Sequence, residues 1–219
     1  MITQEREDYL KTIYKLQQDS SPVRTTVLAK ALEIEPASVT GVIKRLGELE
    51  LVNYQPYKGV TLTPSGERVA LEVIRHHRLI ELYLIEMLGY SWDEVHDEAE
   101  RLEHVVSDLF EERIAAALGY PEIDPHGAPI PSKEGRIAPQ TGGRLSKRKV
   151  GDRGVITQVY DDDPHLLRYL GDLGIRPGVA IEILSIEPYG GGIEIRIKDS
   201  ESHHIGLEAA SNVLIELDT

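Results

Sequence analysis

Near the N-terminus, apolar residues recur every three or four positions, which is the spacing of one face of a helix. These residues are Tyr9, Leu10, Ile13, Tyr14 and Leu16. A helix is therefore expected over residues 3–18, and the Ser-Ser-Pro sequence that follows should end it.

The next segment contains two short helical patterns followed by two strand patterns. A helix capped by Thr25 or Thr26 precedes a Glu-Pro step, after which a second helix begins, because proline suits a first helical turn. The inward-facing residues of this second helix are Val39, Val42, Ile43 and Leu46. Residues 51–63 predict two strands around a Lys-Gly turn. Two short helices followed by a β-hairpin predict a winged helix-turn-helix over residues 1–63.

Two longer helical patterns follow the hairpin. Thr63 can cap a helix that runs to about Leu88, and a second helix is expected from about Trp92 to Leu118, where Gly and Pro follow. A pair of long helices after a winged domain is a common way to form a dimer, so residues 64–131 are expected to be a helical dimerisation domain.

The C-terminal third changes in composition and then in period. Residues 132–149 are rich in Pro, Gly, Ser and basic residues and predict a linker. Over residues 150–219, apolar and polar residues alternate with period two, interrupted by one short helix at about 164–173. This predicts a small β-barrel of about five strands. The expected fold class is therefore mainly α with β.

Charge is distributed unevenly along the chain. The formal net charge is −13, yet residues 22–75 hold seven Lys or Arg against six acids, a net of +1. Residues 76–128 hold three Arg against thirteen Asp or Glu, a net of −10. The first region could therefore bind nucleic acid, since the distribution of charge along the chain matters more than the total net charge. The second region suits either solvated helix faces or cation binding.

Composition excludes several classes of protein. The chain has no cysteine, which excludes disulfides, thiolate catalysis and cysteine-ligated zinc or iron–sulfur sites. The longest apolar run, residues 79–88, is interrupted by Glu81 and Glu86, so no membrane span is expected. The first ten residues lack the basic flank and apolar stretch of a signal peptide, which predicts a cytoplasmic protein.

Histidines and carboxylates recur at helical spacing on the two long helices. His77 and Glu81 are four residues apart and share one face. On the second helix, positions i, i+4, i+7 and i+8 are occupied by His96, Glu100, Glu103 and His104. Asp8, on the N-terminal helix, can complete such a set. Each pair alone suits an ordinary surface ion pair, but together, on helices that must pack, they predict a metal site.

Oxygen and imidazole donors without sulfur favour hard or borderline divalent metals. Mn²⁺ and Fe²⁺ fit best, and Zn²⁺ or Co²⁺ can substitute because the order of affinities is set by the metal. Mg²⁺ is less suitable, since it binds imidazole reluctantly and keeps its waters.

The winged domain offers positions for contact with double-stranded DNA. These are Arg24, Thr26, Ala37, Ser38, Thr40, Gly41, Lys44, Arg45 and Lys58. Lys44 and Arg45 are expected to touch phosphates, although an ordinary solvated helix face is the alternative. The small residues of the second short helix allow only short or apolar base contacts, so DNA shape should contribute to specificity.

Six segments carry motifs in a fixed order: EDYLKTIYKL, LTPSGE, HHRLIELYL, VHDEAERLEHVVSD, DPHGAPIP and LGIRPG. In this order they resemble the diphtheria-toxin-repressor family of metal-dependent regulators, over essentially the whole chain. The resemblance implies that the C-terminal barrel is an SH3-like, FeoA-type domain. It also implies a homodimer that binds a palindromic operator and represses metal-homeostasis genes.

The resemblance further implies two metal sites per subunit. One would use Asp8, Glu100, Glu103 and His104. The other would use His77, Glu81 and His96, with Asp162 and His165 contributed by the barrel. Iron-responsive members have Met and Cys where this chain has Asp8 and Glu100, so the resemblance implies the manganese-responsive branch. Lys11 departs from the Glu of some two-domain manganese regulators, which argues against their closely spaced binuclear arrangement, and the barrel ligands imply the three-domain arrangement instead.

Three alternatives stay open from the sequence. An iron(II)-dependent regulator would share the architecture, and a di-metal hydrolase would use the same ligand types to activate water. A metal-independent winged regulator would bind DNA in the presence of chelator. We expect a regulator and not an enzyme, because no substrate-binding loop is evident. His126, His203 and His204 have no assigned role and are expected at the surface.

Overall fold

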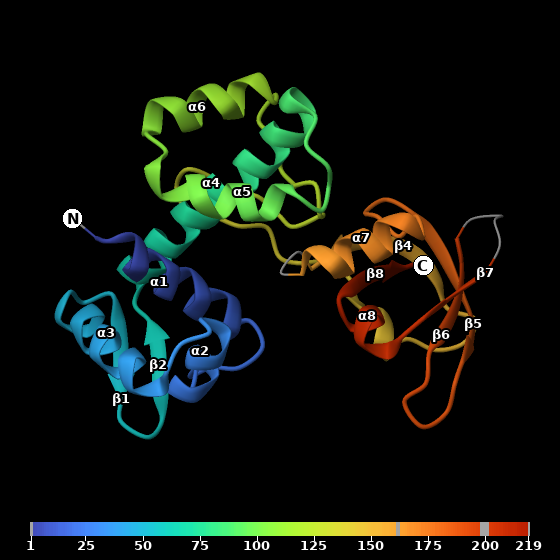
Figure 1. The fold of residues 1–219 in the computed structure, drawn as a ribbon, viewed down its shortest axis with the longest axis horizontal. Coiled ribbons are helices and arrows are strands. Elements are labelled where there is room, and N and C mark those ends of the chain that lie inside the picture. Colours follow the sequence, from blue (N-terminus) through green and yellow to red (C-terminus); the bar gives the residue numbers. More distant parts are fainter. Residues whose placement is uncertain (1, 161–162, 198–201, 219) are drawn as a thin grey trace. The chain divides into compact units, whose positions relative to one another are not determined.

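The computed structural model describes residues 2–160, 163–197 and 202–218. The chain divides into two compact units, whose elements are labelled in Figure 1. The winged unit comprises residues 1–76, 103–106 and 131–136. The helical–barrel unit comprises residues 77–102, 107–130 and 137–219.

The winged unit contains the predicted helices and hairpin (Figure 1). Its elements are α1 (Gln4–Gln17), α2 (Thr25–Ala31), α3 (Pro36–Glu48), β1 (Val52–Gln55), β2 (Gly59–Leu62) and the first part of α4 (Pro64–Leu88). β1 and β2 are antiparallel, with Val52 opposite Leu62. Its fully buried side chains include Leu10, Ile13, Leu28, Ile43 and Leu46. The winged helix-turn-helix is thereby confirmed.

The start of α4 is capped as predicted. The Thr63 hydroxyl accepts a hydrogen bond from the Gly66 amide at 3.1 Å, which satisfies one donor of the first turn. Gly66 also permits close packing, because a Cβ at this position would lie 2.0 Å from the Leu51 carbonyl oxygen. The first turn of α4 is therefore held against the chain that precedes the wing.

The single helix expected after Gly89 is interrupted. The segment consists of α5 (Val95–Leu102), a 3-10 turn (Glu103–Val105) and α6 (Asp108–Ala117). Ser107 has an extended backbone and accepts a hydrogen bond from the Phe110 amide at 3.3 Å, so it N-caps a new helix. The prediction of one helix from Trp92 to Leu118 is therefore wrong. A capping serine offers the backbone an alternative to continuing the helix.

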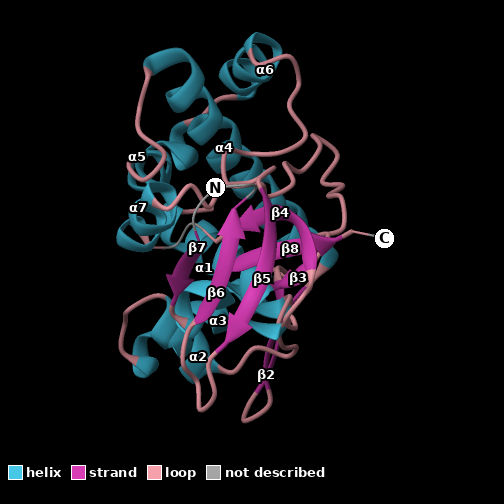
Figure 2. Cartoon of the chain, turned by 90° about the vertical axis from the view of Figure 1, so that its right-hand side faces the viewer, coloured by secondary structure: helices cyan, strands magenta, loops and turns pink. Residues whose placement is uncertain are grey.

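A six-stranded antiparallel sheet dominates the C-terminal part of the helical–barrel unit (Figure 2, magenta). Its strands are β3 (Gly143–Arg144), β4 (Arg153–Val159), β5 (Ala180–Ile186), β6 (Ile193–Ile197), β7 (Ser202–Ile205) and β8 (Val213–Leu217). The order across the sheet is β3-β8-β4-β5-β6-β7. Two short helices, α7 (Pro164–Asp172) and α8 (Leu207–Ser211), accompany it.

The sheet begins earlier than the sequence predicted. β3 lies within the expected linker, residues 132–149, and pairs with β8. Leu145, directly after β3, is fully buried in the barrel core. A two-residue strand carries no period-two signal, which is why the expected count was about five strands. The short helix predicted at about 164–173 is present as α7.

The fold class, mainly α with β, is confirmed as a winged helix-turn-helix, a helical region and a small antiparallel β domain. Among the described residues, none of the helices combines the length and the apolar content that a membrane crossing requires.

Candidate metal centre

Three of the predicted ligands converge in the winged unit. His104 Nε2 lies 2.8 Å from Asp8 Oδ1 and 3.2 Å from Glu103 Oε1. Asp8 comes from α1, whereas Glu103 and His104 belong to the 3-10 turn after α5. The three donor atoms all lie within 4.8 Å of one another, so a single ion could contact them all. This set is called the first cluster.

Other charged and polar groups surround the first cluster. Lys11 is buried, and its Nζ lies 2.5 Å from Glu103 Oε1. Glu7 Oε2 lies 2.7 Å from His104 Nδ1, and the His76 Nδ1–H donates to the Glu103 carbonyl oxygen at 3.1 Å. The sequence analysis missed Glu7, although it precedes Lys11 by one helical turn and thus shares its face.

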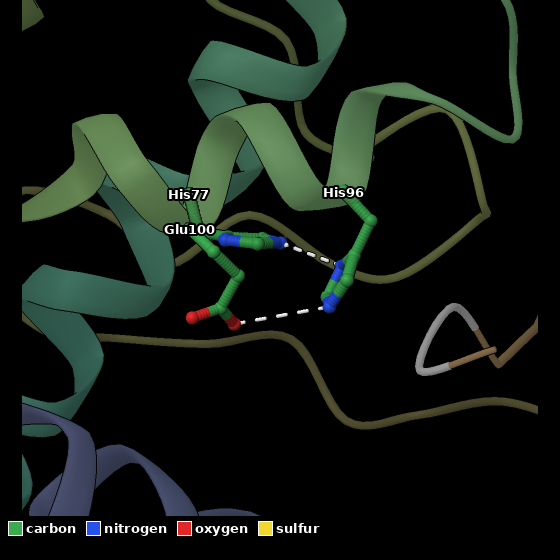
Figure 3. Close-up of side chains that lie close together, drawn as sticks. All are labelled: His77, His96 and Glu100. Atoms are coloured by element: carbon green, nitrogen blue, oxygen red, sulfur yellow. Dashed lines mark hydrogen bonds and ion pairs between the residues drawn. The ribbon is translucent and has the colours of Figure 1, made fainter. Parts of the chain in front are cut away.

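A second cluster lies in the helical–barrel unit. Glu81 Oε1 is 2.9 Å from His77 Nε2 and 3.3 Å from His96 Nδ1. The two ring nitrogens are 3.1 Å apart, and Figure 3 shows the edge of the His77 ring directed at His96. All three side chains are buried, with Glu81 completely so. The structure therefore brings His77, Glu81 and His96 together as predicted.

Glu81 is held as a carboxylate in this buried position. Burial by itself raises the pKa of Glu81, but the charge of His77, the hydrogen bonds with His77 and His96 and the nearby ring of His126 outweigh burial. The pKa of Glu81 therefore lies well below its usual range. An ionised, buried carboxylate facing imidazole nitrogens is a suitable ligand for a cation.

Glu100 lies with the second cluster. Its Oε1 is 3.8 Å from His96 Nε2, and in Figure 3 its carboxylate is close to both imidazoles. The expected single stripe is thus divided, with His96 and Glu100 in one cluster and Glu103 and His104 in the other. The implied assignment of Glu100 to the site of Asp8 stays a prediction.

The two ligands expected from the barrel are Asp162 and His165, and the described contacts join neither of them to the second cluster. Asp162 lies outside the described residues. His165 is exposed in the first turn of α7, where its backbone amide donates to the Asp163 carboxylate at 2.9 Å. Within the described part of the chain, no hydrogen bond or ion pair connects the His165 ring to His77 or His96. Both barrel assignments therefore stay predictions.

His126 does not lie at the surface, so that prediction was wrong. Its side chain is fully buried, with Nδ1 3.7 Å from Glu81 Oε2 and Nε2 3.0 Å from the Trp92 carbonyl oxygen. A histidine between Pro and Gly usually indicates an exposed turn, and only tertiary contacts bury it. Of the other two histidines, His203 is half-buried and His204 is exposed.

The donor sets of both clusters fit a divalent cation. Each combines imidazole nitrogen with carboxylate oxygen, and the chain contains no cysteine. The second cluster gathers two ring nitrogens and one carboxylate oxygen within 3.3 Å in a buried location. Three possible metal ligands so close together in the buried interior are favourable when a positive charge lies between them.

The expected DNA-binding residues lie on accessible parts of the winged unit. All nine are exposed except Thr40, which is half-buried. On α3, Gly41 faces open space, and Arg45 forms an exposed ion pair with Glu48 at 2.8 Å. Lys58 lies at the tip of the β1–β2 hairpin. The positions are accessible to a large partner, and their contacts with DNA stay predictions.

Comparisons with known proteins identify the family. Residues 1–60 match the iron-dependent repressor N-terminal DNA-binding domain, residues 63–132 the iron-dependent repressor metal-binding and dimerisation domain, and residues 143–217 the FeoA domain. The iron-dependent repressor IdeR of Mycobacterium bovis is 31% identical over 96% of both chains.

Solved structures agree with this match. A manganese-dependent transcriptional repressor in complex with manganese is 38% identical, with a TM-score of 0.90, covering 96% of this chain and 99% of its own. The manganese regulator SloR is 32% identical, with a TM-score of 0.81, covering 97% of this chain and 98% of its own. The chain therefore belongs to the diphtheria-toxin-repressor family, the metal-dependent, DNA-binding iron-dependent repressors.

Proposed function

We propose that the protein is a manganese-activated repressor of metal-homeostasis genes. It acts in the cytoplasm as a homodimer on a palindromic operator and is not an enzyme. The observation that carries this proposal is the first cluster, where Asp8 of α1 meets Glu103 and His104 of the turn between α5 and α6. Asp8 is at least 95 positions from Glu103 and His104 in the sequence. A metal ion bound by all three residues would therefore tie two distant segments together.

The consequence for regulation follows from covalent connectivity. The turn carrying Glu103 is continuous with α5 before it and with α6 after it, whereas α1 packs in the core of the winged unit. When bound, a divalent cation would offset the mutual repulsion of the Asp8 and Glu103 carboxylates. Asp8, Glu103 and His104 would then hold α1 to the segment that joins α5 and α6. This selects the DNA-competent state by differential binding.

The oxygen donors favour manganese over iron. Asp8 and Glu100 present carboxylates where the iron-responsive branch, by the family resemblance, carries thioether and thiol sulfur. Replacing soft sulfur with hard oxygen shifts preference towards Mn²⁺, although Fe²⁺, Zn²⁺ and Co²⁺ bind the same donor types. The similarity to a manganese-dependent repressor solved with manganese supports this choice.

DNA affinity measured against free metal tests the proposal. Fluorescence anisotropy with a duplex selected from a random library should show about 5- to 150-fold tighter binding in Mn²⁺ than in chelator. Glu103→Gln and Asp8→Asn should abolish this gain while circular dichroism shows the fold retained. Asp97→Asn, which neutralises an exposed carboxylate on α5, is the matched control and should bind like the wild type.

The outcomes separate the competing functions. DNA binding that is unchanged by chelator would establish a metal-independent regulator and overturn the proposal. Turnover of phosphoesters in Mn²⁺ would favour a hydrolase. The choice of metal is tested by comparing Mn²⁺ with Fe²⁺ at matched free concentrations without oxygen. The Asp8→Met, Glu100→Cys double variant should then move the response towards Fe²⁺.

A further inference from the structure

The segment around His126 is packed tightly against the barrel. The His126 carbonyl oxygen accepts a hydrogen bond from the Val159 amide of β4 at 2.9 Å. Gly127, with φ +87°, approaches β4 so closely that a Cβ there would lie 2.1 Å from the Thr157 carbonyl oxygen. Any displacement of this segment must therefore also disturb β4.

The same segment is held from the helical side. Asp124 Oδ1 accepts hydrogen bonds from the backbone amides of His126 at 2.8 Å and Ala128 at 2.9 Å. Its other oxygen, Oδ2, lies 3.3 Å from Nε of Arg78 on α4. Arg78 is one residue from His77, so α4 positions both the segment and the second cluster.

The imidazole of His126 joins the second cluster to Trp92. A carbonyl oxygen only accepts, so the Nε2–H of His126 donates to the Trp92 carbonyl at 3.0 Å. The opposite ring nitrogen, Nδ1, faces Glu81 Oε2 at 3.7 Å. The other carboxylate oxygen of Glu81 faces His77 and His96. Glu81 therefore lies between the candidate cation position and His126.

Trp92 continues the connection into the barrel. Its indole packs in the barrel core together with Leu167 and Leu170 of α7. The ring also lies 5.0 Å from the His126 ring, and the Arg176 guanidinium lies 4.9 Å above it. Both ends of His126, the side chain through Trp92 and the backbone through Val159, thus reach the barrel.

We propose that His126 is a positioning residue that couples occupancy of the second cluster to the packing of the barrel on the helical region. The proposal rests on the proposed metal function, because it requires a cation at His77, Glu81 and His96. A buried ring that lies against the far oxygen of a ligating carboxylate, as His126 does at 3.7 Å from Glu81 Oε2, limits the rotation of the carboxylate and so orients it for the metal. By the reciprocity of linked equilibria, binding at the cluster must then stabilise the contacts of His126 with β4.

Hydrogen–deuterium exchange tests the coupling. The Glu103→Gln background removes the first cluster, so any effect of Mn²⁺ reports the second. In this background we expect Mn²⁺ to slow exchange of peptides covering β4, which include the Val159 amide. His126→Phe keeps a planar ring but has no ring nitrogens and should abolish this slowing. It should also weaken Mn²⁺ binding about 10- to 100-fold in calorimetric titration.

Controls make the result decisive. His204→Gln, at an exposed histidine of the same barrel, should retain the effect of Mn²⁺ on β4. If circular dichroism shows that His126→Phe is unfolded without metal, His126→Leu, which is smaller and also lacks ring nitrogens, gives the same comparison. Equal protection of β4 in wild type and His126 variants would overturn the coupling but leave the metal function standing. Absence of Mn²⁺ binding in the wild-type protein would instead overturn the proposed metal function itself.

Discussion

Lys11 is a single side chain that brings its own positive charge into the first cluster. It is 6% exposed, and its Nζ lies 2.5 Å from the Glu103 oxygen that also faces His104. A buried carboxylate requires such a partner, because desolvation of an unpaired charge is costly. We therefore predict that a divalent cation bound by Glu103 would compete with Lys11 for the same oxygen, so that the lysine lowers the affinity for metal.

Lys11→Met should therefore separate stability from metal affinity. Without metal, the variant should lose about 3 kcal/mol of unfolding free energy, because the buried Glu103 carboxylate loses the ammonium group that compensates its charge. Mn²⁺ should bind about tenfold more tightly, since no ammonium has to be displaced. Urea denaturation in chelator and calorimetric titration measure the two quantities.

The comparison variant is Lys11→Arg, which keeps the positive charge and should bind Mn²⁺ much as the wild type does. An affinity for Mn²⁺ in Lys11→Met no higher than that of the wild type would contradict the competition.

Among the elements, α3 divides its residues sharply between core and solvent. Val39, Ile43 and Leu46 are fully buried, whereas Lys44 and Arg45 are exposed. The buried side is held by apolar contacts that tolerate no polar group, so the helix can present only its other side to a partner. Helix α3 is therefore the element we assign to the major groove.

Lys44→Ala should weaken DNA binding without changing stability. Lys44 is exposed and is expected to touch phosphate, so its removal should lower affinity similarly for all DNA sequences. The slope of log affinity against log salt should fall in magnitude by about 1. Anisotropy titrations over a range of salt concentrations measure it, with Lys30→Ala, an exposed lysine of α2, as control. An unchanged salt slope would exclude the phosphate contact.

At the scale of the whole molecule, α6 carries exposed apolar side chains that we expect to lie in the dimer interface. Leu109 is 67% exposed and Phe110 is 50% exposed. Adjacent exposed apolar residues usually mark an interface, and this helix lies in the region that matches a dimerisation domain.

Phe110→Glu should therefore convert the dimer to monomers, since a charge would be buried in the interface. Analytical ultracentrifugation measures the state of assembly, and DNA affinity should fall with it because half of the binding surface is lost. Val150→Glu, at a 58% exposed apolar residue of the barrel domain, should remain dimeric. A dimeric Phe110→Glu protein would show that α6 is not the interface.

Metal and DNA should also strengthen each other equally across the molecule. If Mn²⁺ tightens DNA binding by a given factor, DNA must tighten Mn²⁺ binding by the same factor. Titrating Mn²⁺ into the protein with and without the selected duplex measures one factor, and anisotropy measures the other. Two unequal factors would mean that a further equilibrium, such as dimerisation, is linked to both.

The sequence by itself determined the features that depend on neighbouring residues. The spacing of His77 and Glu81 placed both on one face of α4, because an α-helix returns to the same face after four residues. Thr63 started α4 as predicted, and period-two alternation indicated the sheet, since capping and pleating are local effects. The family motifs identified the architecture before any contact was known.

Only the tertiary structure decided which distant groups meet. His96 and Glu103, expected on one stripe, lie in different clusters, and packing buries His126 beside Glu81. Lys11 forms an ion pair with Glu103, 92 positions away in the sequence. These pairings depend on how whole elements pack and exclude water, a property that residue spacing along one helix does not contain.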